Sequence, residues 1–425
     1  MRTPITKGEN QDFKGPRASR RGHWRFDDKE NITCFEKGDY GMSKETAMRE
    51  NDTPFPVPDY RFDQKNDMFK RVLWDEKMKP YGQQFYKEVK YQEKAGYRKI
   101  DYAFRNASWN LEWSAGFGNV RSNSGLYSWE GLNDRIKAYV EAGDSVRESP
   151  QEMSRIIKKV ARFFGADLVG ICRVHPNWIY SHEYNKATGE HTPIEIPDSC
   201  HNAIVMAIAM DYKCFQMSPS AEMGAAAGLG YSKMAFVANL LATFIRGLGY
   251  RALPSGNDTV ISIPLAMAAG LGESGRSGLL ITRKFGPRVR ICKVFTDLSL
   301  HYDAYQPFGV NEFCKVCKKC AKYCPSQAIP HGDMMTEGYN ISNHSGVMKW
   351  YANMEKCFIF WAKNHMECGN CIRVCPFNKP PGLIHDISRA IIRRTPLFNL
   401  PLLWADNILQ YDKQLPATAF WDNSC

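Results

Sequence analysis

Residues 314–325 read CKVCKKCAKYCP, and residues 357–376 read CFIFWAKNHMECGNCIRVCP. The first run spaces its cysteines as Cys-x2-Cys-x2-Cys-x3-Cys-Pro, which is the bacterial ferredoxin pattern for a [4Fe–4S] cluster. The second run repeats the pattern with its first cysteine moved upstream. A zinc site would place two pairs of ligands around one ion, and it would not need two sets of four that each end in Cys-Pro. The sequence therefore predicts two iron–sulfur clusters, in preference to zinc sites or disulfides.

The last cysteine of each run is expected to bind the cluster of the other run. Two-residue gaps aim three thiolates at one cluster, whereas the fourth cysteine is carried onto a following turn that points away. The predicted ligands of cluster 1 are Cys314, Cys317, Cys320 and Cys375, and those of cluster 2 are Cys324, Cys357, Cys368 and Cys371.

Composition and charge narrow the class of protein. The chain has 425 residues with 44% hydrophobic and 12% aromatic content, which predicts a globular protein of two or three domains. The net charge of +11 would suit a nucleic acid or an anionic membrane surface. Lysines and arginines are spread along the chain without a dense stripe, so we expect no nucleic-acid partner. No window has the 18 or so uninterrupted apolar residues that span a bilayer.

The six cysteines outside the two runs are scattered, and the sequence predicts buried free thiols for them and no disulfide framework. Near the amino terminus, Ser19-Arg20-Arg21 is similar to a twin-arginine export signal. The residues that follow it, 22–28, contain no apolar stretch, so the segment does not form such a signal as it stands.

The order of apolar segments predicts an α/β layer arrangement between about 146 and 305. A capping box at 149–152 opens a helix, and 231–248 predicts a long helix that ends at Gly249. The predicted strands lie at 166–174, 202–210, 278–282 and 289–295, with an excursion from the sheet between the first two. Residues 1–145 are polar and aromatic and are expected to wrap over another domain. Residues 386–425 are expected to pack back on the body.

Two clusters in a chain this long indicate that electrons pass to something else. No glycine-rich dinucleotide fingerprint occurs in a strand–helix setting, and no Asp-x-His-x-x-Gly pattern supplies a lower histidine ligand for cobalamin. From the residues alone, a flavin and a base-off corrinoid both remain open.

Four further segments, in this order along the chain, make a specific resemblance. They are GLGYSKM at 228–234, GYRALPSGNDT at 249–259, AGLGESGRSGLLIT at 269–282 and FGPRVRICKVFTDL at 285–298. Together with the cysteine runs they resemble the corrinoid/iron–sulfur reductive dehalogenases of organohalide-respiring bacteria, over residues 150–380. The resemblance implies a nitroreductase-like core at 146–305 that holds a base-off corrinoid. It also implies a ferredoxin-like domain with two [4Fe–4S] clusters at 306–385.

The resemblance further implies Tyr231 as a proton donor, with Arg290 and Asn257 beside it. A phenol with a pKa of about 10 is a poor acid until a nearby cation stabilises its phenolate, and an arginine cannot lose its charge. Arg288, in the same strand, is an alternative to Arg290. The residues expected at the corrinoid are Gly256, Arg276, Arg288 and Met234. The candidates for an aromatic substrate pocket are Trp361, Tyr81 and Trp74, with Trp109 and Trp113 as weaker ones.

The activity implied is the removal of halide from a small chlorinated hydrocarbon, with a chloroalkane slightly favoured over a chloroethene. Partners implied are a low-potential electron donor and a separate small membrane-anchor protein. The implied location is the outer face of the cytoplasmic membrane, reached by twin-arginine export. An epoxyqueuosine reductase that modifies tRNA is the first alternative, and an iron–sulfur electron carrier is the second.

Overall fold

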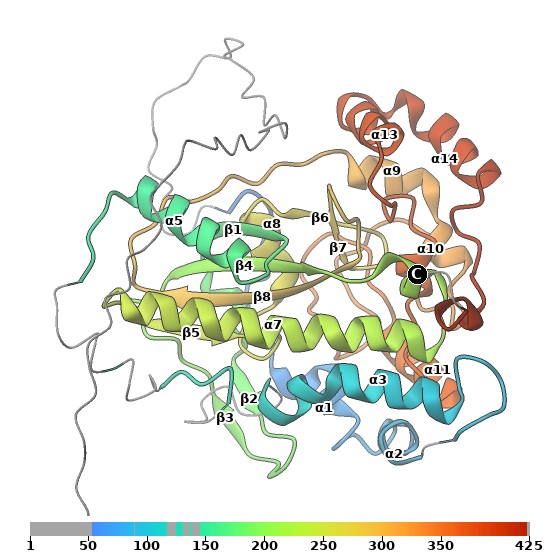
Figure 1. Ribbon diagram of the computed structural model, residues 1–425, viewed down its shortest axis with the longest axis horizontal. Helices are drawn as coiled ribbons and strands as arrows, with labels where there is room; N and C mark the ends of the chain where they lie inside the picture. The colour runs from blue at the N-terminus through green and yellow to red at the C-terminus, as the bar shows by residue number, and fades with distance from the viewer. Residues whose placement is uncertain (1–52, 89, 117–124, 131–136, 138–144, 423–425) are drawn as a thin grey trace, which may run out of the picture. The chain divides into compact units, whose positions relative to one another are not determined.

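The structure is a computed structural model, and it describes residues 53–88, 90–116, 125–130, 137 and 145–422 (Figure 1). The segment Ser19-Arg20-Arg21 lies outside these residues. Residues 50–425 pack as one compact unit.

A four-stranded antiparallel sheet forms the centre of this unit. Its strands lie in the order β1 (Leu168–Arg173), β4 (Asn202–Ala209), β8 (Val289–Thr296) and β5 (Ala252–Ser255). The apolar runs at 166–174, 202–210 and 289–295 therefore form three strands of this sheet. Alternate residues of β4 enter two different apolar cores. Because helices cover both faces of the sheet, its strands are largely apolar, and the charged residues Arg290 and Lys293 in β8 are exceptions.

Helices α5 (Pro150–Phe163) and α7 (Ala221–Gly247) cover one face of the sheet, and α8 (Ser262–Ala268) covers the other (Figure 1). The serine cap of the expected capping box is present, since Ser149 Oγ accepts the amide of Glu152 at 3.2 Å, whereas the Glu152 carboxylate accepts from Arg155. Among the described residues, α7 has the length and apolarity of a membrane span, but more than half of that window is buried inside the protein. It serves as a core helix here.

Helix α7 begins ten residues earlier than the expected 231–248. Ser220 caps it by accepting the amide of Met223 at 3.5 Å. The glycines at 224, 228 and 230 lower helix propensity but allow close approach of other groups. For example, a Cβ at Gly228 would lie 2.3 Å from Trp109 Cδ1. Tyr231 consequently lies in the middle of a helix, one turn after Gly228, and not at a helix start.

Two hairpins lie outside the main sheet. Strands β2 (His182–Tyr184) and β3 (His191–Pro193) form one of them, within the expected excursion between β1 and β4. Strands β6 (Gly272–Ser274) and β7 (Leu280–Thr282) form the other. The segment predicted as a strand at 278–282 thus belongs to a separate two-stranded sheet.

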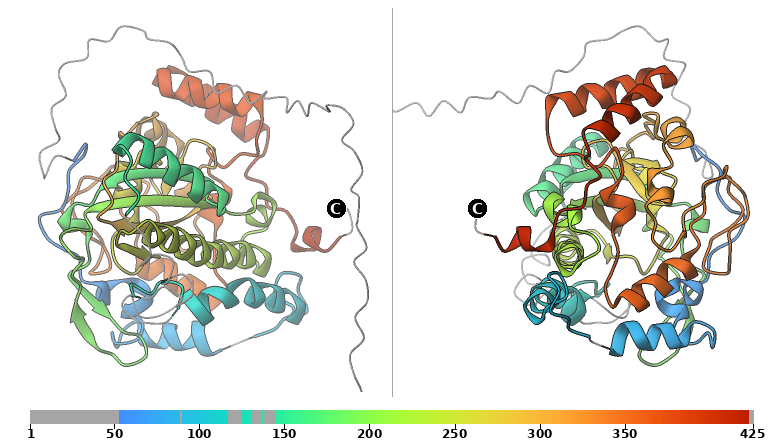
Figure 2. Two further views of the ribbon diagram at one scale, coloured as in Figure 1. Left: turned by 60° about the vertical axis from the view of Figure 1, so that its left-hand side comes forward. Right: turned by 90° about the vertical axis from the view of Figure 1, so that its right-hand side faces the viewer.

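The described part of the amino-terminal segment forms short helices that lie against later parts of the chain. Helix α3 (Lys99–Leu111) packs along α7, and α2 (Lys79–Lys87) packs against α11 (Met354–Asn364) (Figure 2). The remaining elements of this segment are η1 (Gln64–Asn66), α1 (Met68–Arg71) and the π-helical turn η2 (Glu112–Gly116).

The cysteine-bearing helices follow β8. They are α9 (Val310–Cys317), α10 (Lys319–Lys322), α11 and α12 (Asn370–Arg373). Among the elements near the carboxyl terminus are α13 (Leu383–Arg394) and α14 (Asn399–Ile408), and α14 packs against α9. Lys319 Nζ lies 2.6 Å from Asp406 Oδ2 and 3.0 Å from Asp412 Oδ2, and these ion pairs join the carboxyl-terminal segment to the cysteine region.

Candidate functional site

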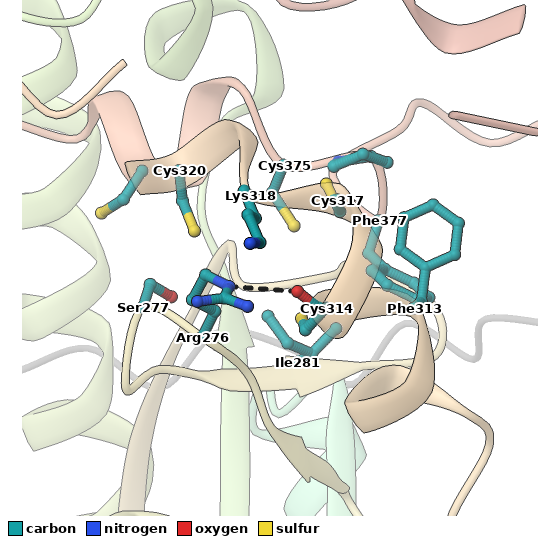
Figure 3. Close-up of a pocket in the computed structure, with 12 residues that line it drawn as sticks. Arg276, Ser277, Ile281, Phe313, Cys314, Cys317, Lys318, Cys320, Cys375 and Phe377 are labelled. Atoms are coloured by element: carbon teal, nitrogen blue, oxygen red, sulfur yellow. Dashed lines mark hydrogen bonds between the residues drawn. The ribbon is translucent and has the colours of Figure 1, made fainter. Parts of the chain in front are cut away.

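The four cysteines assigned to cluster 1 line one cavity (Figure 3). Cys314 and Cys317 come from α9, Cys320 comes from α10, and Cys375 follows α12. Lys318 makes the turn between α9 and α10 with a φ of 50°, which lets the chain reverse between the second and third thiols. The structure therefore brings Cys375 to the first run, across 55 residues of sequence.

The four cysteines assigned to cluster 2 form a second group. Cys324 belongs to a small apolar cluster against which Cys357 and Cys371 pack. Burial raises the pKa of Cys371 most, and the charges of Cys368, Cys357 and Cys324 raise it further. The amide of Ala328 donates to Cys324 Sγ at 3.3 Å, a contact typical of cluster-bound sulfur. Cys371 also borders the first cavity, so the two groups adjoin there.

Burial dominates the electrostatics of these thiols. It raises the pKa of Cys317 and of Cys357 to about 12 and that of Cys368 to about 11. The charge of a neighbouring cysteine adds to the shift in each case, and backbone amide donation opposes it at Cys317 and Cys368. Thiolates so placed require compensating positive charge, which bound iron supplies. Eight cysteines in two groups of four can hold two four-iron clusters.

Arg276 belongs to the cluster 1 cavity and not to the surroundings of Tyr231. Its side chain is 2% exposed, and Nε donates to Cys314 O at 3.0 Å (Figure 3). Nη1 donates to the carbonyls of Pro330 and Gly332 at 2.9 and 2.7 Å. The expected corrinoid contact of Arg276 does not fit this placement, because these carbonyls already hold its guanidinium beside the cysteines.

Arg288 and Arg290 are separated by the structure. Arg288 donates to Met210 O and, through Nε, to Asn378 Oδ1 at 3.0 Å, so it ties the end of β4 to the residues after Cys375. Arg290 instead reaches α7, where its guanidinium carbon lies 4.4 Å from the centroid of the Tyr231 ring. Of the two alternatives, Arg290 is the one beside Tyr231.

Tyr231 is held on several sides. The ring of Trp109 stacks on it with centroids 4.9 Å apart and planes 24° apart, and Trp113 stacks on Trp109 at 5.7 Å. Asn257 Nδ2 donates to Tyr231 Oη at 3.2 Å. Tyr231, Arg290 and Asn257 were expected together, and the fold brings them together from α7, β8 and the loop after β5.

A buried lysine orients Asn257. Lys293, fully buried in β8, donates from Nζ to Gly256 O and to Ser262 Oγ, the latter at 2.9 Å. Ser262 Oγ in turn donates to Asn257 Oδ1 at 3.4 Å. Because Ser262 donates to the amide oxygen of Asn257, the NH2 group of Asn257 is turned towards the phenol oxygen of Tyr231. Burial lowers the pKa of Lys293 to about 8, and the charge of Asp258 opposes this shift.

Three buried polar atoms around Tyr231 have no hydrogen-bond partner among the described residues. They are Arg290 Nε, Tyr127 Oη and Glu112 Oε2. Glu112 is 6% exposed, its amide donates to Ser232 Oγ, and burial raises its pKa to about 8. Tyr127 belongs to the same apolar core that Tyr231 packs against. Buried polar groups are normally paired, so these atoms indicate a ligand with both donors and acceptors.

Two residues expected at the corrinoid are buried by the protein itself. Met234 is fully buried in the core between α7 and the sheet. It lies one turn after Tyr231, where the helix faces the sheet, and this placement differs from the expected cofactor contact. Gly256 is also buried, and a Cβ there would lie 2.9 Å from Tyr127 Oη. Its backbone carbonyl accepts from Lys293, so its part in the site is to shape the Asn257 loop.

The three candidates for the aromatic substrate pocket make their contacts away from Tyr231. Trp361 on α11 packs with Phe69 and Phe85 at centroid distances of 5.7 and 6.0 Å, and its Nε1 is buried without a partner among the described residues. Tyr81 packs in the apolar cluster formed there by α1, α2 and α11. Trp74 Nε1 donates to Lys65 O at 2.7 Å.

No described contact joins these three residues to Tyr231. Trp109, expected only as a weaker contributor, is the aromatic residue that touches it.

Sequence reasoning did not single out Lys293, Glu112 or Tyr127. A charged residue inside the apolar strand 289–295 was a usable signal for Lys293, because a lysine is almost never fully buried unless its charge is paired. No comparable signal pointed to Glu112, which comes from a segment without clear periodicity.

One apolar cluster connects the two parts of the site. It contains Met210, Phe215, Met223 and Ile372, and both Trp109 and Cys371 pack against it. Packed protein thus extends from the aromatic residue on Tyr231 to a cysteine of the second group.

Comparison with known proteins agrees with this geometry. Residues 313–378 match the family described as a 4Fe-4S double cluster binding domain. A tetrachloroethene reductive dehalogenase of Desulfitobacterium hafniense is 40% identical over 304 residues, which are 62% of this chain and 55% of that protein. That of Sulfurospirillum multivorans is 35% identical over 357 residues, 77% of this chain and 71% of that protein.

A solved reductive dehalogenase, reported with a mechanism for B12-dependent dehalogenation, superposes with a TM-score of 0.66 at 26% identity. The superposition covers 86% of this chain and 48% of that one. This chain spans about half the length of most of the curated relatives it matches most strongly.

The fold and the paired cysteine groups define an iron–sulfur protein with a 4Fe-4S double cluster domain joined to a mixed α/β core. Its similarity to the tetrachloroethene reductive dehalogenases shows that the chain belongs to the reductive dehalogenase family.

Proposed function

We propose that the protein is a corrinoid-dependent reductive dehalogenase that removes halide from a small chlorinated hydrocarbon. The observation that carries this proposal is the arrangement at Tyr231, whose oxygen accepts from Asn257 and whose ring contacts Arg290 and Trp109. The relatives named for tetrachloroethene dehalogenation and the B12-dependent structure support it.

The residues around Tyr231 fit a corrinoid in a nitroreductase-like core. The rim of a corrinoid carries amide groups, which both donate and accept hydrogen bonds. Arg290 Nε could donate to such an amide, and the protonated carboxyl of Glu112 could donate or accept. These two residues and Tyr127 are the ones we assign to holding the group.

Bound at this site, a corrinoid supplies the reduction of the carbon–halogen bond, with electrons from two [4Fe–4S] clusters. The balance is R–X plus two electrons and one proton, giving R–H and X⁻. Tyr231 Oη provides the proton to the carbon. The N–H of Asn257 and the cation of Arg290 stabilise the phenolate that remains. Trp109 holds the ring plane and excludes water from one side of the phenol.

The substrate class follows from the apolar, aromatic surroundings, since small apolar ligands bind in sites of this kind. The expected preference for a chloroalkane finds no support in the relatives, which are named for chlorinated ethenes. The assay therefore has to compare the two classes directly.

The experiment is anaerobic purification under corrinoid-replete conditions, followed by metal analysis and chloride release with a reduced viologen dye. We expect about eight irons and about one cobalt per chain, with chloride release from tetrachloroethene or from 1,2-dichloroethane. Full cofactor content without chloride release from either compound would refute the proposal. In that case, protection of the protein by tRNA would favour an epoxyqueuosine reductase. Iron without cobalt would favour an electron carrier.

We also infer peripheral association with the outer face of the cytoplasmic membrane, through a separate small anchor protein. What supports this is an apolar surface on α13, α14 and the turn between them, where Leu383, Leu397, Leu400 and Trp404 are 77, 81, 62 and 68% exposed. Apolar surface of this extent marks a contact site. Co-purification with the anchor, and its loss after Leu400→Glu and Trp404→Glu, tests the inference. Unchanged co-purification would refute it.

A further inference from the structure

A group of metal-ligating side chains lies at the β2–β3 hairpin, and the proposed dehalogenation does not use it. Asp63, His182 and His191 each offer one ligand atom, and these atoms all lie within 4.8 Å of one another. His191 Nε2 is 2.9 and 3.0 Å from the two carboxylate oxygens of Asp63. The imidazole rings of His182 and His191 have centroids 4.5 Å apart and planes 30° apart.

The hairpin register places both histidines on one face. Tyr184 pairs with His191, and His182 pairs with Pro193, so His182 and His191 are diagonal neighbours on the same side of the two strands. Asp63 approaches from a different part of the chain, immediately before η1, where its Oδ1 accepts the amide of Lys65 at 3.0 Å. The tertiary fold therefore brings Asp63 next to the two histidines, which lie about 120 residues later in the sequence.

The orientation of His182 also suits a ligand. Its Nδ1 lies 3.1 Å from Ser181 Oγ, and its Nε2 has no hydrogen-bond partner among the described residues. In metal sites, the histidine nitrogen that does not bind the ion is usually hydrogen-bonded to an oxygen, which fixes the ring. The hydrogen bond between His191 and Asp63 does not by itself account for a second imidazole stacked on the first.

We propose that Asp63, His182 and His191 bind one divalent transition-metal ion of the zinc type. Two imidazole nitrogens and one carboxylate oxygen are a donor set that zinc and its neighbours accept. All three side chains are partly accessible, so a water molecule can take the fourth position. The site requires only small side-chain rotations, because the ligand atoms of a tetrahedral zinc site lie somewhat more than 3 Å apart, as bond lengths of about 2.0–2.1 Å dictate.

The ion acts as a tether between the hairpin and the loop that carries Asn257. Gln64, next to Asp63, is 2% exposed and has two contacts. Its Oε1 accepts the amide of Tyr184 at 2.9 Å, and its Nε2 donates to Asp258 O at 2.8 Å. An ion that fixes Asp63 to the hairpin therefore restrains a segment that is one hydrogen bond from the residue after Asn257. This inference does not depend on the chemistry at Tyr231.

The test uses the cluster-loaded protein, treated briefly with EDTA, supplied with ZnCl2 and desalted. We expect about one zinc per chain with unchanged iron content. His182→Ala and His191→Ala should each weaken zinc binding at least tenfold in calorimetric titration. His201→Ala is the matched control, because His201 is an exposed histidine whose Nδ1 contacts only the nearby Asp198 O among the described residues. It should bind zinc as the parent protein does.

X-ray absorption at the zinc edge separates this site from the cysteines. We expect nitrogen and oxygen neighbours at about 2.0–2.1 Å and no sulfur shell at about 2.3 Å. A sulfur shell, or equal zinc content in the parent protein and both histidine variants, would overturn the proposal. If an alanine variant loses iron or helical content, His182→Gln and His191→Gln replace it. Zinc binding retained by both would equally overturn the proposal.

Discussion

The guanidinium carbon of Arg290 lies 4.4 Å from the centroid of the Tyr231 ring, over its π face and not at its oxygen. The oxygen receives its hydrogen bond from Asn257 instead, at 3.2 Å. Arg290 therefore fixes the ring and supplies positive charge nearby, while Asn257 donates a hydrogen bond to the oxygen that would give up a proton. The two residues have separable effects, and variants can distinguish them.

Tyr231→Phe should leave both cofactors bound and should reduce dehalogenation by about 10²–10⁴-fold, the usual contribution of a positioned proton donor. The phenyl ring keeps the stacking on Trp109 and the contact with Arg290, and it loses only the hydroxyl. Metal analysis and turnover on the same preparation check this. Unchanged turnover with full iron and cobalt would remove Tyr231 from its role.

Lys293→Met and Ser262→Ala should each lower kcat without a matching rise in KM. Both changes break the chain of donors that orients Asn257, and neither residue contacts Tyr231 in the described structure. The Ser262 variant is the milder test, because Lys293 keeps its bond to Gly256 O. Loss confined to KM would instead indicate that the chain shapes substrate binding.

Gly228→Ala should lower both activity and stability. The new methyl group would lie 2.3 Å from Trp109 Cδ1 and must push Trp109 away from Tyr231. We expect a loss of about 1–3 kcal/mol in the free energy of unfolding, as is typical of overpacking.

Gly247→Ala, in the last turn of the same helix, is the control for the Gly228 change. A Cβ at Gly247 meets nothing within 4 Å, so this change should stabilise the helix slightly and leave turnover unchanged. Equal effects of the two substitutions would show that Trp109 packing does not matter.

Glu112→Gln should remove a pH dependence of stability. Burial raises the pKa of Glu112 from 4.5 to about 8, so between these values the folded protein binds more protons than the unfolded chain. Stability of the parent protein should therefore fall as pH rises from about 5 to 8, by at most about 1.4 kcal/mol per pH unit from this group. Melting temperatures of cluster-loaded, corrinoid-free protein at pH 6 and 8 check the difference, and identical slopes for both proteins would contradict it.

Cys324→Ala and Cys375→Ala should each damage the cluster that the other cysteine run mainly holds. Cys375 lines the cavity of Cys314, Cys317 and Cys320, so its removal should affect cluster 1. Cys324 groups with Cys357 and Cys371, so its removal should affect cluster 2.

Electron paramagnetic resonance of singly reduced protein should show the same cluster lost in Cys324→Ala as in Cys368→Ala. Cys200→Ser, outside both groups, is the control. A signal in which Cys324→Ala matches Cys314→Ala would mean that each run holds its own cluster.

Several features were predictable because they depend on local spacing. The two-residue gaps and the Cys-Pro endings predicted two groups of four cysteines before any fold was known. Largely apolar runs predicted three strands of the main sheet, since strands covered on both faces need no polar alternation, although the run at 289–295 also contains Arg290 and Lys293. The capping motif predicted the start of α5, because the Ser149 side chain accepts a first-turn amide locally.

Other features depended on contacts between distant segments, and no local pattern encodes them. The start of α7 at Ala221 was missed because three glycines lower helix propensity there, and packing against α3 and other elements offsets that cost. Arg276 and Arg288 resembled Arg290 by sequence, yet carbonyls and an amide oxygen elsewhere in the fold hold them at the cluster region. Met234 followed Tyr231 by one turn, but the helix face there meets the sheet.

The sequence by itself determined the double-cluster class of this protein, because the ligands of iron–sulfur clusters follow a characteristic cysteine spacing within short segments. Only the tertiary structure decided which side chains surround Tyr231. Trp109 and Glu112 come from adjoining elements of the amino-terminal segment, whereas Tyr231 and Lys293 lie more than 110 residues later, and the contacts among them exist only once these segments pack together.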